Sequence, residues 1–186
     1  MQSESRSRAI SALVQHARDT FEKRHEDTET AALVAPISPS PPALIQSVLE
    51  SLSLSSGDVV VDLGCGDGRW LIAAALMAHC TCRGFDLNES LVVKGRRDAD
   101  QSRVSPLVSL EKANIFQVSL AGATVIIVYL FREGLARMKT KLETESRPGV
   151  RVVSVGFQIR GWSTLSRVEI GGLNVYLYQV PERGVT

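Results

Sequence analysis

The chain has 186 residues, of which 44% are hydrophobic and 22% are charged, values typical of a globular protein. This length suits a single domain with one sizeable core, and the formal net charge of +1 demands neither nucleic acid nor an anionic membrane as a partner. The longest apolar runs, residues 71–78 and 125–131, are well short of the roughly twenty residues that span a bilayer. We therefore expect no transmembrane segment.

Cysteine usage indicates a reducing, intracellular compartment, either cytoplasmic or mitochondrial. The chain has three cysteines (Cys65, Cys80 and Cys82) with no C-x-x-C pair, and its three histidines are not clustered. This pattern predicts neither a disulfide framework nor a bound metal.

Residues 1–37 are predicted to form a helical extension and a connector, and residues 38–186 the main domain. Apolar residues at helical spacing indicate an amphipathic helix that lies on the domain or covers its ligand: Ile10, Leu13, Val14, Ala17 and Phe21. Acidic residues between positions 19 and 29 argue against a transit peptide. Proline-rich residues 35–42 are expected to be extended, and Pro41 and Pro42 to open a helix over 43–52.

The stretch from Val59 to Leu71 reads VVVDLGCGDGRWL and dominates the analysis. A β-branched run ends in Asp62, glycines follow at every second position, and helix formers continue to residue 79. This pattern predicts a buried strand, a tight turn and a helix, which is the βα unit of a doubly wound sheet. Bare glycine backbone in the turn would also let a ligand lie against the main chain.

The turn can be compared with known nucleotide-binding patterns. A dinucleotide fingerprint would need a third glycine where Arg69 stands, and a P-loop would need G-K-[ST] where the chain has Gly68-Arg69-Trp70. The remaining pattern, D-x-G-x-G-x-G, resembles the first motif of the class I S-adenosylmethionine (SAM) methyltransferases. Asp62 would then face the ligand's ammonium group, and four turn residues would line the ligand: Gly64, Cys65, Gly66 and Gly68. The alternative is a closely packed turn that binds nothing, with Cys65 simply a small residue that fits there.

A second acid, Asp86, ends the next predicted strand, residues 82–86, 24 positions after Asp62. Its two oxygens could accept hydrogen bonds from both ribose hydroxyls, and Leu87 would contact the ligand beside it. The alternative role for Asp86 is the N-cap of a helix over residues 89–101, whose basic residues we interpret as a solvated face.

The third predicted strand, residues 106–110, is followed by Asn114 and Ile115. In class I enzymes an acid often stands here against the adenine amino group. The Asn114 carbonyl could accept the same hydrogen bond, with Ile115 beside it, although a loop asparagine at this point could equally have no such role.

The rest of the chain predicts an alternating pattern that ends in two paired strands. An apolar strand over 125–131 carries Tyr129 near its carboxyl end, where ligands of open α/β sheets bind. A helix over 133–143, a strand over 150–157 and two strands around Gly171-Gly172 follow. The predicted fold is α/β: a doubly wound, mostly parallel seven-stranded sheet of the Rossmann-like class I methyltransferase type, with a C-terminal antiparallel hairpin.

The segment Ser38-Pro39-Ser40-Pro41-Pro42 resembles the V-P-T-P-P segment of a small family of protein-lysine methyltransferases. That family includes the mitochondrial enzymes acting on the ATP synthase c subunit and the adenine nucleotide translocase, with prokaryotic relatives. Further similar segments keep the order and spacing to about residue 181: residues 128–130, 148–154 and 175–178. The resemblance implies that Ser40 lies next to the methionine end of SAM and that Tyr129 lies near the transferred methyl group. Asn114 in place of an acid and the missing membrane anchor of the animal members are departures.

The expected reaction is an in-line attack by a neutral amine, most simply a lysine of a protein substrate, on the SAM methyl group without a metal. A water-poor aromatic channel would lower the pKa of the amine; candidate walls are Tyr129, Phe131, Phe157 and Trp162, with core packing as the alternative. An RNA or DNA base methyltransferase would carry [DNS]-P-P-[YFW] where this chain has residues 128–131, VYLF. A small-molecule methyltransferase and a SAM-binding module without turnover remain as further alternatives.

Overall fold

A computed structural model describes residues 39–182. The predicted amphipathic helix and residues 35–38 of the proline-rich connector lie outside the described residues. Within residues 39–182, no helix is both long and apolar enough to cross a membrane.

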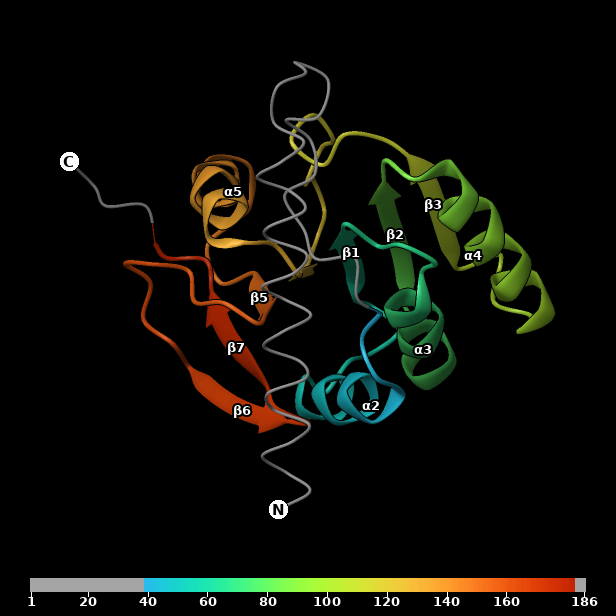
Figure 1. The fold of residues 1–186 in the computed structure, drawn as a ribbon, viewed down its shortest axis with the longest axis horizontal. Coiled ribbons are helices and arrows are strands. Elements are labelled where there is room, and N and C mark those ends of the chain that lie inside the picture. The colour runs from blue at the N-terminus through green and yellow to red at the C-terminus, as the bar shows by residue number, and fades with distance from the viewer. Residues whose placement is uncertain (1–38, 183–186) are drawn as a thin grey trace.

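The described chain forms one seven-stranded sheet with the order β3-β2-β1-β4-β5-β7-β6 (Figure 1). The first five strands run parallel, and β7 lies antiparallel between β5 and β6. The strands are β1 (Val59–Leu63), β2 (Thr81–Asp86), β3 (Val108–Lys112), β4 (Val125–Val128), β5 (Arg151–Val155), β6 (Ser166–Ile170) and β7 (Leu173–Gln179). The helices are α2 (Pro42–Ser51), α3 (Arg69–Ala78), α4 (Glu89–Gln101) and α5 (Arg132–Glu145). The predicted α/β fold with a terminal antiparallel hairpin is confirmed.

Helices cover both faces of the sheet and enclose two apolar cores. On one face, α2, α3 and α4 pack against inward residues such as Val60 and Val153. On the other face, α5 packs against residues such as Val61, Leu63 and Val152 (Figure 1). Because successive strand residues point to opposite faces and both faces are covered, β4 is apolar throughout and β1 is apolar apart from Asp62, which explains the continuous apolar runs in the sequence.

Strand β4 ends three residues earlier than predicted. Its last residue, Val128, pairs with Leu63 of β1 and Ser154 of β5, and both ladders stop there. The following residues leave the sheet, and α5 begins at Arg132. Tyr129 therefore lies just beyond the carboxyl end of the central strand.

A buried carboxylate fastens the opposite, amino-terminal edge of the sheet. Asp58, directly before β1, accepts hydrogen bonds from Thr124 Oγ1 at 2.6 Å, Ser55 N at 2.8 Å and Arg151 Nη2 at 2.5 Å. Arg151 also donates to the carbonyl of Leu52, which follows α2. Burial alone would raise the pKa of Asp58, but these hydrogen bonds and the charge of Arg151 outweigh burial and lower it to about 2.

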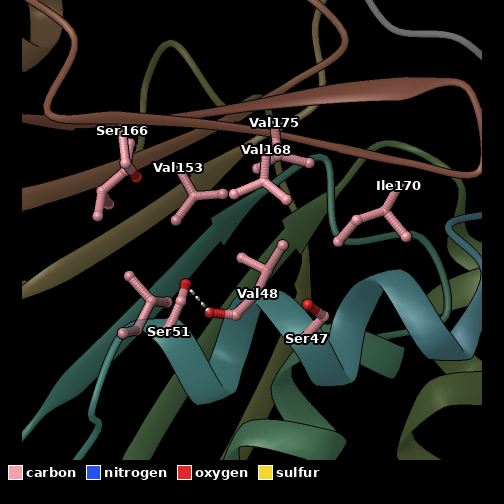
Figure 2. A pocket seen from close by; sticks show the side chains of 10 residues that line it. Ser47, Val48, Ser51, Val153, Ser166, Val168, Ile170 and Val175 are labelled. Atoms are coloured by element: carbon pink, nitrogen blue, oxygen red, sulfur yellow. Dashed lines mark hydrogen bonds between the residues drawn. The ribbon is translucent and has the colours of Figure 1, made fainter.

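A small apolar cavity of about 60 Å³ lies between α2 and the strands β5, β6 and β7. Figure 2 shows Val48 pointing from α2 towards Val153, Val168 and Val175 of the sheet. Small-molecule sites usually enclose about 300 Å³ or more, so this cavity is a packing gap under the hairpin. A second cavity of about 310 Å³, lined by residues 122–124 and 147–151, lies at the amino-terminal edge of the sheet. Neither cavity lies where the sequence places the ligand.

Candidate active site

The carboxyl ends of four parallel strands bring the predicted site residues to one edge of the sheet. The glycine turn follows β1, Asp86 ends β2, Asn114 follows β3 and Tyr129 follows β4. The strand order reverses between β1 and β4, because β2 and β3 lie on one side of β1 and β4 and β5 lie on the other. Ligands of open α/β sheets bind in the crevice at such a switch point.

The turn after β1 depends on left-handed backbone at all three glycines. Gly64, Gly66 and Gly68 have φ values of +99°, +54° and +69°, a region that residues with a side chain rarely adopt. A Cβ at Gly64 would meet no atom within 4 Å, and one at Gly66 would meet only Leu91 Cδ1 at 3.9 Å. A Cβ at Gly68 would lie 2.7 Å from Leu110 Cδ1. The first two glycines thus leave open space at the crevice, whereas Gly68 lets the start of α3 pack closely.

Asp62 is a buried acid without a hydrogen-bond donor among residues 39–182; only 4% of its surface is exposed. Burial, together with the charge of nearby Asp86, raises its pKa to about 8. It alternates with Val61 and Leu63, which face α5, so it points to the face covered by α2 and α3. A buried carboxyl group without a partner is suited to a ligand that brings a cation, such as the ammonium group of SAM.

Asp86 is tied to the glycine turn through the backbone. Its Oδ2 accepts from Gly66 N–H and its Oδ1 from Asn88 N–H, both at 2.8 Å. The alternative that Asp86 caps the next helix is wrong, because the N-cap of α4 is Asn88, whose Oδ1 accepts from Leu91 N at 3.3 Å. Each carboxylate oxygen keeps a further acceptor site for a ligand hydroxyl.

Replacing Asp86 with alanine is expected to weaken SAM binding by about 1–3 kcal/mol, because two hydroxyl donors of the ligand would lose their acceptor. Isothermal titration of the wild type and the variant measures the loss. The matched control is Asp98→Ala on α4, whose Oδ2 binds Lys94. The assignment of Asp86 fails if the two variants bind SAM equally well.

The side of the crevice where the sequence predicts the adenosine shows one exposed apolar residue and one half-buried amide. Leu87 is 43% exposed directly after β2, and a bound ligand would cover it. Asn114 is half-buried, and its Oδ1 accepts from Phe116 N at 3.0 Å, which leaves its amide nitrogen for a ligand. Ile115 is buried in the core on the α5 side. The contacts of these three residues with the ligand stay predictions.

Tyr129 is half-buried beside the backbone of β5, and burial raises its pKa. A Cβ at Gly156 would lie 3.0 Å from its ring, and its hydroxyl makes no hydrogen bond within residues 39–182. Phe131, two residues further along the chain, contacts Phe157, which follows β5, with ring centroids 6.1 Å apart. Phe157 packs against the core on the α5 side, whereas Tyr129 packs against the core on the side of α2 and α3. These three aromatic side chains remain candidate walls of an acceptor channel.

Trp162, the fourth candidate wall, is a core residue. It is buried against Tyr178, with ring centroids 5.9 Å apart, and its indole N–H donates to Glu143 at 2.7 Å. Core packing, the alternative reading of the sequence, is therefore the role that its contacts support.

Cys65 is buried in the glycine turn, and burial, followed by the charge of Asp62, raises the pKa of its thiol. Its Sγ lies 2.8 Å from the point that a Cβ of Gly84 would occupy. The thiol therefore fills space between β1 and β2, and its chemistry is that of an inert packing group. Within the described part of the chain, no three His, Cys, Asp or Glu side chains are placed to hold a metal ion.

Sequence reasoning missed the side chains that hold the turn in place. Asp67 forms ion pairs with Arg69 at 2.8 Å and Lys94 at 3.0 Å. A Cβ at Gly95 would lie 2.6 Å from the carbonyl oxygen of Asp67, so α4 packs directly against the turn. The only sequence signal for this cluster is the basic run of α4, which by itself predicts a solvated face.

These residues fit SAM: a buried acid that has no hydrogen-bond donor among residues 39–182 and could face its ammonium group, open backbone at two glycines, and a second acid with further acceptor sites. The fold and the site define a class I SAM-dependent methyltransferase. The sequence model of the ANTKMT methyltransferase domain matches residues 62–166, and the chain belongs to that family.

Individual relatives agree with this membership. A protein-lysine N-methyltransferase from Saccharolobus islandicus is 37% identical over 152 residues, covering 79% of this chain and 94% of its own length. The adenine nucleotide translocase lysine N-methyltransferase of Mus musculus is 32% identical over 142 residues. That match covers 76% of this chain and 62% of the mouse protein. The crystal structure of an RNA methyltransferase from Salinibacter ruber with S-adenosyl-L-homocysteine superposes with a TM-score of 0.76 at 31% identity. That match covers 78% of this chain and 95% of the Salinibacter ruber chain.

Proposed function

We propose that this methyltransferase transfers the methyl group of SAM to the side-chain nitrogen of a lysine in a protein substrate. The observation that carries the proposal is the relation to the Saccharolobus islandicus protein-lysine N-methyltransferase, which extends over nearly the whole of that protein. The mouse relative is also named a lysine N-methyltransferase.

The residues at the carboxyl edge suit an amine acceptor. SAM supplies an electrophilic methyl group on a positively charged sulfur. The lysine must be neutral to attack, and apolar surroundings favour the neutral amine because they disfavour its charged form. Tyr129, Phe131 and Phe157 would provide such surroundings. The hydroxyl of Tyr129, which has no hydrogen-bond partner among residues 39–182, would orient the nitrogen through a hydrogen bond. Alignment of the amine with the methyl group would supply most of the rate enhancement.

An RNA acceptor is the second candidate, because the Salinibacter ruber relative is described as an RNA methyltransferase. The segment after β4 favours the protein acceptor. It reads Tyr129-Leu130-Phe131 and has no proline pair of the kind expected in base-modifying methyltransferases.

Tritium-labelled SAM distinguishes these acceptors. The full chain is incubated with the protein fraction, and separately with the RNA fraction, of host cells from which its gene has been deleted. We expect label in a protein band that yields methylated lysine on hydrolysis, and no label when the Gly66→Val variant replaces the wild type. Label confined to RNA overturns the proposal in favour of the second candidate. Absence of label despite SAM binding overturns it in favour of a binding module.

Replacing Tyr129 with phenylalanine is expected to lower kcat by a factor of roughly five, the value of one hydrogen bond, and to leave SAM affinity within about twofold. Steady-state kinetics and isothermal titration measure the two effects. Tyr178→Phe is the control, because its hydroxyl accepts from Ile159 N at 3.1 Å inside the core; it should lower the thermal midpoint and spare kcat. If Tyr129→Phe changes neither kcat nor SAM affinity, the Tyr129 hydroxyl has no role in the reaction and the side chain serves only in packing.

A further inference from the structure

Arg69 joins the glycine turn to the chain that enters α2. Its Nε donates to Asp67 Oδ1 and its Nη2 to Asp67 Oδ2, both at 2.8 Å, in a two-pronged ion pair. Its Nη1 donates to the backbone carbonyl of Ser40 at 3.3 Å. Ser40 is 5% exposed and lies two residues before α2, so one guanidinium group links segments 29 positions apart.

Asp67, which binds the Arg69 side chain, is itself held in place by its neighbours. Only 9% of its surface is exposed, Lys94 binds the same carboxylate, and the backbone of α4 packs on it at Gly95. The hydrogen bond from Arg69 is the main reason that the pKa of Asp67 lies well below its ordinary value. The carboxylate is thus charged and immobilised, and Arg69 is held in one orientation.

The link lies on the side of the sheet where the amino-acid end of SAM is expected. Asp62 points to the face covered by α2 and α3, and the Ser40 segment leads into α2 on that face. The ribose would lie at Asp86, on the neighbouring strand. A shift of the Ser40 segment would therefore alter the pocket for the amino acid and spare the pocket for adenosine.

We propose that Arg69 is a positioning residue for cofactor binding: braced by Asp67, it holds the backbone at Ser40 against the glycine turn and thereby shapes the pocket for the amino-acid end of SAM. This inference rests on the proposed placement of Ser40 and is independent of the acceptor. Three donors in one rigid plane are required, which arginine has and a lysine ammonium on its flexible stem does not.

The test compares two ligands that share adenosine. S-adenosyl-L-homocysteine carries the amino acid, and 5′-methylthioadenosine lacks it. For Arg69→Met we expect the Kd of S-adenosyl-L-homocysteine to rise about tenfold, the equivalent of about 1.4 kcal/mol, with the Kd of 5′-methylthioadenosine within about twofold of the wild type. Arg69→Lys, which keeps the positive charge, should also weaken the binding of S-adenosyl-L-homocysteine and not that of 5′-methylthioadenosine. It replaces Arg69→Met in the comparison if the methionine variant does not fold.

Lys141→Met is the control for the loss of one positive charge, because Lys141 pairs with Glu145 at 2.7 Å on α5, which covers the other face of the sheet. It should leave both dissociation constants within about twofold, since the contact of Arg69 with Ser40 persists. Equal weakening of the two ligands by Arg69→Met would show a general role in stability and overturn the proposal, as would unchanged binding of both. These measurements use no acceptor, so failure of lysine labelling leaves their outcome unaffected.

Discussion

Replacing Gly66 with valine is expected to abolish measurable SAM binding. The residue has a φ of +54°, and a side chain there would point into space where the nearest atom is 3.9 Å away. That space is where we place the ligand, between the glycine turn and Asp86. Isothermal titration with SAM should show no heat of binding for the variant at concentrations that saturate the wild type.

Valine at a left-handed position also costs conformational energy, about 1–2 kcal/mol or more for a branched side chain. The control variant Gly122→Val distinguishes the effect of this backbone strain from the effect of blocking the ligand site. Gly122 has a φ of +78° with no atom within 4 Å of an added Cβ, and it lines the cavity at the opposite edge of the sheet. The control should lose comparable stability and bind SAM normally. If Gly66→Val bound SAM with wild-type affinity, the glycine turn would not be part of the binding site.

Replacing Asp62 with asparagine is expected to stabilise the cofactor-free protein while weakening its affinity for SAM. The pKa of Asp62 is about 8 in the folded state, against an ordinary value of 3.8, so Asp62 binds a proton in the folded state that the unfolded chain releases. The stability of the wild type therefore falls as pH rises from about 4 to about 8. The gain in stability of Asp62→Asn over the wild type should be largest above pH 8. Thermal unfolding from about pH 5 to about pH 9, with SAM titrations at each pH, measures both effects.

Asp58, four residues earlier, is the contrasting control. Its folded-state pKa of about 2 lies below 3.8, so its carboxylate contributes stability that is complete above about pH 4 and lost as pH falls towards 2. Asp58→Asn should lower the thermal midpoint at neutral pH without affecting SAM affinity, because Asp58 lies at the other end of β1. A loss of stability at pH 9 in Asp62→Asn would contradict the assignment of Asp62 as a strained, ligand-binding acid.

Features set by local chemistry could be predicted from the sequence. The run from Val59 to Leu71 specifies strand, turn and helix because a buried parallel strand needs apolar residues on both faces and the turn needs left-handed backbone. Gly171-Gly172 likewise specifies the hairpin, and both glycines adopt positive φ between β6 and β7. The order of acids and glycines then places Asp62 and Asp86 at the same edge of the sheet.

Features set by contacts between distant segments could not be predicted. The end of β4 depends on where its neighbours β1 and β5 stop, which no local pattern in residues 125–131 reveals. Arg69 reaches Ser40 only because α2 and α3 pack on the same face, and the small size of Gly95 matters only because α4 crosses the turn. Asn88 caps α4 because Asp86 is already bound to the backbone of Gly66 and Asn88.

A crystal structure with S-adenosyl-L-homocysteine tests the central claim most directly. We predict density for the ligand in the crevice between β1 and β4, with its backbone contacts at Gly64 and Gly66, its ammonium group facing Asp62 and its ribose at Asp86. Ligand density at any other part of the molecule, or side chains filling that crevice in crystals saturated with the ligand, would contradict the account.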